Sequence, residues 1–152
     1  MSIRKANKED ACRIAEIFVF NNRMNYFPIF QDESFSFDEL QVIPLVDNYF
    51  TKEEILENLY VLDDGIIRGF LQMQDRELCK LYVDPFFQGK RYGAQLITYA
   101  IDELSANQLW ALEKNIRAIS FYKRHGFHVT KEKKLEEDTS EYLVQLKRTK
   151  SF

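Results

Sequence analysis

The chain has 152 residues, of which 45% are hydrophobic, and its formal net charge is −3. This length and composition predict a single globular domain over residues 1–152, and the slightly acidic charge argues against a nucleic-acid binder, which would carry a basic face. No apolar run approaches the roughly 20 residues that cross a bilayer, and Cys12 and Cys79 suit neither a disulfide framework nor a zinc site. We therefore expect a cytoplasmic protein with no metal and no membrane partner.

The first predicted elements are a short strand and an amphipathic helix. Ile3–Ala6 can form the strand, and Asn7 with Asp10 resembles an N-cap followed by an acidic first turn. Apolar residues then recur at helical spacing, which predicts a helix over about residues 8–20. The aromatic-rich segment 21–50 fits no single pattern.

The middle of the chain changes to the periodicity of strands. Thr51-Lys52-Glu53-Glu54 has the form of a capping box at the start of a second helix. The runs Leu59–Leu62 and Ile66–Gln74 flank Asp63-Asp64-Gly65, and Asp-Gly is a strong hairpin signal. A second tight connection leads to a strand at Leu78–Val83, so an antiparallel meander is predicted.

The segment after this strand is the strongest local signal in the sequence. Asp84-Pro85 ends the strand, and the loop 88–94 leads into a helix whose apolar residues, from Gly93 to Leu104, share one face. Unpaired N–H groups and the positive end of the helix dipole both point at whatever binds at such a turn. The pattern therefore predicts a phosphate-bearing ligand at this loop.

The last predicted elements complete a mixed α/β sheet. A short helix follows Asn115 and ends before Gly126, which suits a left-handed C′ residue. The remaining strands are Leu109–Leu112, Phe127–Thr130 and Tyr142–Leu146. The helix between the strands at 78–83 and 109–112 is a crossover that makes this pair parallel, whereas the earlier strands are antiparallel.

These features together resemble the GNAT superfamily of N-acetyltransferases. Its phosphate-loop pattern is Gln/Arg-x-x-Gly-x-Gly/Ala, of which Gln88 and Gly93 match the first and last positions while Arg91 replaces the middle Gly. A second match is Asn115-x-x-Ala118-x-x-Phe121-Tyr122, followed by Gly126-Phe127. The resemblance implies the acyl-CoA N-acyltransferase fold, a mostly antiparallel sheet whose central parallel strand pair splays apart between flanking helices.

The resemblance also implies that acetyl-coenzyme A is the acetyl donor and that a primary amine of a small molecule or peptide is the acceptor. The pantetheine arm would lie along Leu81, Tyr82 and Val83, and Asn115 would bond its amides, cap the following helix, or do both. The pyrophosphate would rest on the amides of Gln88, Gly89, Lys90, Arg91, Tyr92, Gly93 and Ala94.

Two glycines let the main chain of this loop approach a pyrophosphate closely, because Gly89 and Gly93 have no Cβ. Arg91 would fit if it occupied the first helical turn, where φ is negative. The side chains of Lys90 and Arg91 either add positive charge towards the phosphates or lie in solvent.

Transfer to an amine needs a base for the amine and a proton for the departing thiolate. Glu77 is the candidate base. It stands at the start of its strand and, by the alternation of side chains, should share a face with Cys79, Leu81 and Val83. The alternative is an exposed glutamate at the strand end. Tyr122 is the candidate acid, because a phenol with a pKa of about 10 can donate to a thiolate; the alternative is a packed aromatic. We expect Cys79 to be a buried, inert thiol and not an acetyl-carrying nucleophile.

The acceptor side is predicted only by family analogy, which makes segment 21–50 one wall of the acceptor cleft. Its carboxylates could attract a cationic, partly apolar amine; they are Asp32, Glu33, Asp38, Glu39 and Asp47. The alternative is a solvated loop whose aromatics pack the core or form a homodimer contact. The competing function is a non-catalytic module of the same fold that senses acetyl-coenzyme A.

Overall fold

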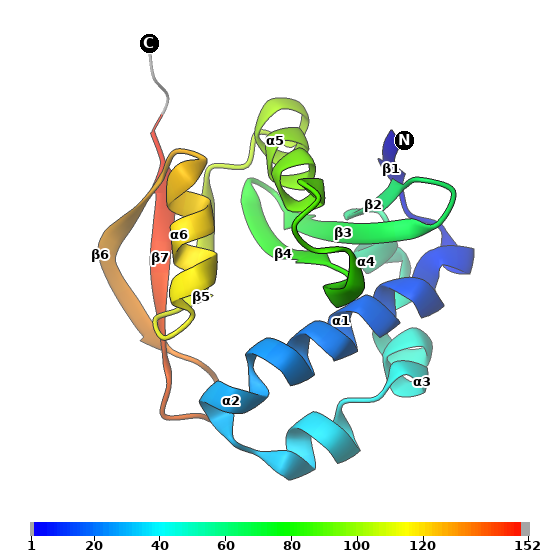
Figure 1. The fold of residues 1–152 in the computed structure, drawn as a ribbon, viewed down its shortest axis with the longest axis horizontal. Coiled ribbons are helices and arrows are strands. Elements are labelled where there is room, and N and C mark those ends of the chain that lie inside the picture. Colours follow the sequence, from blue (N-terminus) through cyan, green and yellow to red (C-terminus); the bar gives the residue numbers. More distant parts are fainter. Residues whose placement is uncertain (1, 150–152) are drawn as a thin grey trace.

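The computed structural model describes residues 2–149, which form one seven-stranded sheet in the order β1-β2-β3-β4-β5-β7-β6 (Figure 1). The strands are β1 Ser2–Lys5, β2 Leu59–Asp63, β3 Ile67–Gln74, β4 Glu77–Val83, β5 Gln108–Leu112, β6 Phe127–Leu135 and β7 Tyr142–Arg148. Only the β4–β5 pair is parallel, and every other neighbouring pair is antiparallel. The predicted mixed sheet with a central parallel pair is confirmed.

Helices cover both faces of this sheet. The α-helices are α1 Ala11–Asn25, α2 Phe27–Phe30, α3 Val42–Leu45, α4 Glu53–Leu56, α5 Tyr92–Leu104 and α6 Ile116–Arg124. The 3-10 and π segments are η1 Lys8–Asp10, η2 Ser34–Glu39, η3 Val46–Phe50 and η4 Pro85–Phe87. No helix among residues 2–149 has both the length and the apolar character that a membrane crossing requires.

The buried side chains form two clusters, one on each face. One cluster joins the sheet to α5 and α6, and the other joins it to α1, η3 and α4. Neighbouring residues of β3, Phe70 and Leu71, belong to different clusters because side chains alternate along a strand. Gly69 of β3 lets α5 pack closely, since a Cβ there would lie 2.9 Å from Leu96 Cδ1.

Helix α1 is longer than the sequence predicts. Asn7 is the expected N-cap, of η1, and forms a capping box with Asp10, but α1 then runs to Asn25 instead of ending near residue 20. Asn21 and Asn22 continue it because each side-chain amide donates to the carbonyl four residues earlier.

The predicted capping box at Thr51–Glu54 is wrong. Lys52 occupies the N-cap position of α4 and makes no side-chain cap hydrogen bond. Thr51 Oγ1 instead donates to the carbonyl of Val46 at 2.7 Å, which ends the preceding turn. The helix is therefore only Glu53–Leu56, and Leu59 begins β2.

Strand β6 is also longer than predicted, because the charged stretch after Thr130 continues the strand to Leu135. Its side chains are mostly exposed, as suits an edge strand paired only with β7. Figure 1 shows β5, β7 and β6 as one arm that stands apart from β1–β4. Gly126, with φ of 91°, ends α6 before this arm as predicted.

The two parallel strands separate soon after they meet. Glu77 pairs with Gln108 and Leu78 with Leu109, and no further residue pair joins β4 to β5. The predicted splay of the central strand pair is thus present in the structure, and it opens the sheet between its two halves.

Strand β4 contains a bulge at the point where the splay begins. Leu78 and Lys80 face adjacent residues of β3, so Cys79 is an additional residue in β4. The bulge shifts the alternation of side chains. As a result Leu78 and Leu81, three residues apart, contact the same cluster with α5, whereas Tyr82 contacts the cluster with α1.

Candidate active site

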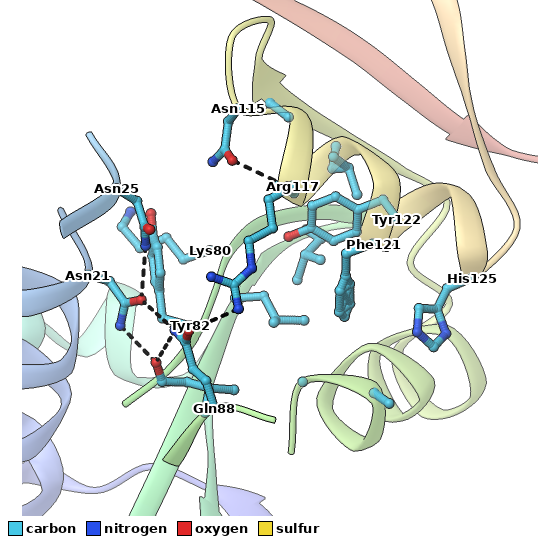
Figure 2. Close-up of a pocket in the computed structure, with 18 of the residues that line it drawn as sticks. Asn21, Asn25, Lys80, Tyr82, Gln88, Asn115, Arg117, Phe121, Tyr122 and His125 are labelled. Carbon is cyan, nitrogen blue, oxygen red and sulfur yellow. Dashed lines mark hydrogen bonds between the residues drawn. The ribbon is translucent and has the colours of Figure 1, made fainter. Parts of the chain in front are cut away.

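A cleft of about 470 Å³ lies where β4 and β5 separate. Figure 2 shows its two walls, with Asn21 and Asn25 of α1 on one side and Arg117 and Tyr122 of α6 on the other. The predicted coenzyme-binding residues that line it are Leu81, Tyr82, Val83, Gln88, Gly89, Arg91, Tyr92, Gly93, Ala94, Asn115 and Tyr122. Lys90 and Glu77 do not line it.

The loop before α5 presents main-chain N–H groups to this cleft. The first N–H of this helix to bond back is that of Gln95, which donates to the carbonyl of Arg91 at 3.1 Å. Gly89 and Arg91 both have positive φ, 83° and 64°. Left-handed residues within a turn bring successive N–H groups to one side, which forms a concave anion site.

The expected conformation of Arg91 is therefore wrong. Helix α5 begins at Tyr92, so Arg91 is its N-cap and not a residue of its first turn. Its φ of 64° is the left-handed conformation that glycine adopts freely and other residues adopt at a cost of roughly 1–2 kcal/mol. The loop keeps the shape that the missing glycine would give, with a charged side chain added.

The main chain of β4 can also pair with a ligand in the cleft. The N–H of Asp84 donates to the carbonyl of Arg68 on β3, and main-chain groups alternate in direction along a strand. Those of Leu81 and Val83 therefore point away from β3, towards the gap that β5 leaves. An extended amide-bearing arm fits such a strand edge.

One of these main-chain groups is already bonded within the protein. The carbonyl of Val83 accepts from Asn21 Nδ2 at 2.9 Å and from Gln88 Nε2 at 3.4 Å (Figure 2). The groups left for a ligand are the N–H and carbonyl of Leu81 and the N–H of Val83.

Asn21 is a site residue that the sequence analysis missed. It is 2% exposed, and its Oδ1 accepts from Asn25 and Gln88. It therefore joins α1 to the end of β4 and to the loop 88–94, called the phosphate loop below. The signal was present in the sequence, because Asn21 falls on the same helical face as Ile14 and Ile17. A polar residue on an apolar face is informative when it is buried.

Tyr122 lies in the cleft with its ring against Phe121 and Phe127, at centroid distances of 5.2 and 6.0 Å. Burial raises the pKa of Tyr122. The phenol therefore keeps its proton at neutral pH and has it available for donation. Two other cleft phenols, Tyr26 and Tyr82, share a hydrogen bond of 3.0 Å, and burial is the main reason that the pKa of each is raised.

Glu77 is placed differently from the prediction. The bulge in β4 breaks the expected parity, so Glu77 does not lie on the same face as Leu81 and Val83. Its carboxylate accepts from the Cys79 thiol, with Oε2 3.7 Å from Sγ. Its role as a base stays a prediction.

The environment of Cys79 does not favour a nucleophilic thiolate. Burial, helped by the negative charge of Glu77, raises the pKa of the Cys79 thiol to about 11. A thiol with this pKa is almost entirely protonated at neutral pH.

Asn115 caps α6, since its Oδ1 accepts from the N–H of Ala118 at 3.2 Å. This cap uses only one end of the carboxamide. Asn115 also lines the cleft, so both roles considered for it are sterically compatible.

The five carboxylates of segment 21–50 are not where the prediction required them. All five are exposed, and none lines the cleft. The charged side chains that line it within residues 2–149 are all basic, namely Lys80, Arg91, Arg117 and Arg124. Within the same residues, no group of three or more His, Cys, Asp or Glu side chains is placed to hold a metal ion.

A family model described as "Acetyltransferase (GNAT) domain" matches residues 56–129, which include β2 to β5, the phosphate loop and α6. No protein with a curated description matches the chain.

Solved structures share the fold over nearly the whole chain. The apo form of YjaB from Escherichia coli has 20% identity and a TM-score of 0.79, with 99% of this chain and 98% of that chain covered. The PaiA N-acetyltransferase of Thermoplasma acidophilum, in complex with coenzyme A, has 21% identity and a TM-score of 0.59, with 96% and 98% covered. The yncA protein of Salmonella typhimurium, with its cofactor acetyl-CoA, has 19% identity and a TM-score of 0.62, with 95% and 91% covered.

Proposed function

Since this chain belongs to the GNAT superfamily of N-acetyltransferases, we propose that it transfers an acetyl group from acetyl-coenzyme A to a primary amine by direct attack in a ternary complex. The observation that carries the proposal is the continuity of one cleft, from the N–H groups of the phosphate loop, along the open edge of β4, to the Tyr122 phenol. Solved relatives of the same fold contain coenzyme A or acetyl-CoA.

The donor half of the cleft suits a long, phosphate-bearing thioester. Its pyrophosphate would rest on the amides of residues 88–94, and the charges of Arg91 and Arg117 lie nearby in the lining. Its amide-bearing arm would pair with the main chain of Leu81 and with the N–H of Val83. These contacts would direct the thioester carbon towards the bulge in β4.

The reaction forms a C–N bond and breaks the C–S bond of the thioester. The amine nitrogen attacks the carbonyl carbon, and the main-chain N–H of Leu81, the free one nearest to the bulge, stabilises the oxyanion that forms, while the carbonyl of Leu81 and the N–H of Val83 hold the arm. The departing sulfur takes the proton of Tyr122. The proton lost by the amine reaches Glu77 through water, since this carboxylate does not line the cleft itself.

One observation favours the second candidate function, a sensor of acetyl-coenzyme A. Every charged residue in the cleft lining among residues 2–149 is basic, so the lining itself supplies no carboxylate base. A sensor needs only the donor half of the cleft.

Coenzyme A release in the presence of a broad panel of amines separates the two functions. An acetyltransferase should release thiol in proportion to acetylated amine, while a sensor should show ligand-induced melting shifts and no release. Absence of any calorimetric heat with both acetyl-CoA and coenzyme A would contradict both functions.

A further inference from the structure

The bulge in β4 determines which side chain meets the acceptor half of the cleft. Because Cys79 is an additional residue, Lys80 lies on the opposite face of the strand from Leu78, and this is the face that it shares with Tyr82. This is the face covered by α1, away from the phosphate loop and α6. Lys80 is also part of the cleft lining, so its side chain borders the space that remains for an acceptor (Figure 2).

The ammonium group of Lys80 is held in place by aromatic rings. It donates to Tyr49 Oη at 3.1 Å and lies 5.0 Å from the centroid of the Tyr49 ring and 5.6 Å from that of Phe18. An ammonium has three donors, and only this one hydrogen bond engages them within residues 2–149. Two donors remain for a ligand.

Lys80 makes no ion pair with any carboxylate among the described residues. Two acidic groups act on residues of this part of the cleft, namely Glu77, beside Cys79, and Glu136, whose charge adds to the effect of burial in raising the pKa of Tyr26. Neither carboxylate lines the cleft. A half-buried cation without an anionic partner attracts an anion strongly, because little water screens it.

The other basic residues of the cleft belong to the loop before α5 and to α6. Arg91 is part of the phosphate loop, and Arg117 donates to Gln88 Oε1 at 3.3 Å beside that loop. Arg124 lies at the end of α6, next to His125. Lys80 alone among them lies on the α1 face of β4.

We infer that Lys80 binds a carboxylate of the acceptor, so that the amines this protein acetylates are amino acids or other amines that carry a carboxylate. The inference rests on the proposed function, and it replaces the cationic acceptor that the exposed carboxylates of segment 21–50 had suggested.

The test compares acceptors that differ only in the carboxylate: amino acids, their carboxamides, and the amines left by decarboxylation. The wild-type protein should prefer the carboxylates by on the order of 30-fold in kcat/KM, as expected when one partner of a desolvated charge pair is removed. Lys80→Met should abolish this preference and leave coenzyme A affinity unchanged. Lys80→Arg, which keeps the charge, should retain part of it.

Two matched variants complete the design. Lys52→Gln removes an exposed lysine outside the cleft and should keep the full preference. Glu136→Gln tests the alternative of a cationic acceptor, because Glu136 acts on Tyr26 of the cleft through its charge, and attraction of cationic amines by this charge should weaken in the variant. Wild-type protein that acetylates carboxamides or decarboxylated amines equally well, or a preference that survives in Lys80→Met, would overturn the inference and leave the acetyltransferase intact.

Failure of the proposed function gives a different result, namely coenzyme A binding without acetylation of any amine. In that case carboxylate binding to the coenzyme-loaded protein is measured directly by NMR titration. Binding that disappears in Lys80→Met would uphold the carboxylate site without catalysis, while no binding in the wild type would overturn it.

Discussion

Arg91 has a main-chain conformation that the phosphate loop requires but that a residue with a side chain disfavours. Its left-handed φ would suit glycine, and glycine is what the family pattern has at this position. Strained main chain persists where the surrounding structure holds it in place, commonly at functional sites. The side chain of Arg91 also lines the cleft, so it brings a positive charge to the place where the phosphates are proposed to bind.

Replacing Arg91 by Gly should therefore separate stability from binding. The fold should be unchanged or more stable by up to about 1 kcal/mol in urea unfolding, because the strain is removed. Coenzyme A affinity should fall by about tenfold in calorimetry, because a charge beside the phosphates is lost. Lys131→Gln removes an equal charge from the exposed part of β6 and should alter neither quantity. Undiminished affinity would mean that the Arg91 side chain lies in solvent.

Tyr122 gives the sharpest test of the proposed chemistry. Tyr122→Phe keeps the ring against Phe121 and Phe127 and removes only the proton donor, so turnover should fall by about 100-fold or more while coenzyme A affinity stays the same. Steady-state kinetics with calorimetry in parallel measures both. Tyr60→Phe, a phenol packed against Tyr99 outside the cleft lining, is the matched control. An unchanged rate would remove Tyr122 from the mechanism.

At the scale of elements, one side chain joins α1 to the strand that carries the cleft. Asn21 donates to the carbonyls of Ile17 and Val83 at 2.9 Å each, and is itself buried. A second contact lies nearby: Arg13 of α1 forms an ion pair with the buried carboxylate of Asp84, with Nη2 2.6 Å from Oδ2. These contacts hold the end of β4 beside α1, although β5 no longer pairs with this part of β4.

Asn21→Leu should show how much this connection contributes. The variant is similar in size but leaves the carbonyl of buried Val83 with only the long hydrogen bond from Gln88 and removes an acceptor from the half-buried Asn25 and Gln88, which should cost about 1–3 kcal/mol of unfolding free energy. Asn22→Leu removes one hydrogen bond within the same helix and should cost less. Urea unfolding of both variants measures the difference, and equal losses would contradict a bridging role for Asn21.

Elements with strong local signals were predictable from the sequence. The meander, the loop before α5 and the Gly126 helix end follow from turn residues and periodicity, and these elements position most of the cleft lining. The bulge at Cys79 was not predictable, because β4 reads as regular and the irregularity exists only relative to β3. The role of Thr51 was not predictable either, because its hydroxyl donates to the carbonyl of Val46, in the preceding turn, and does not cap α4. Asn21 was predictable in principle from its helical face.

At the scale of the whole molecule, buried phenols come from both sides of the split sheet. Tyr82 belongs to β4, Tyr122 to α6, and Tyr26 follows α1, and burial raises the pKa of all three. These phenols remain protonated in the folded protein at a pH where the unfolded chain, with a pKa near 10, ionises. Their contribution to stability is complete below about pH 10 and is lost as the pH rises above it.

Alkaline titration should therefore unfold the protein in one cooperative step. We propose that residues 1–152 behave as a single domain, so phenolate absorbance at these three positions and loss of helical circular dichroism should share one midpoint above about pH 10. Tyr122→Phe should reduce the absorbance change of that step. Two separate midpoints in circular dichroism would contradict a single domain. A phenolate signal that appears below the unfolding pH and is absent from Tyr122→Phe would contradict the burial of Tyr122, because the difference from wild type separates this phenol from the seven other tyrosines.

The additional residue in β4 has a consequence for how proteins of this architecture diversify. Inserting one residue into β3 between Gln72 and Met73 would let Cys79 pair regularly and would put Leu78 and Lys80 on the same face, while leaving loop 88–94 and its helix untouched. If both side chains lay on the face of the core, the Lys80 ammonium would be buried; if both lay on the other face, Leu78 would leave the core. The insertion of a single codon would thus change which acceptor is bound without changing how coenzyme A is recognised.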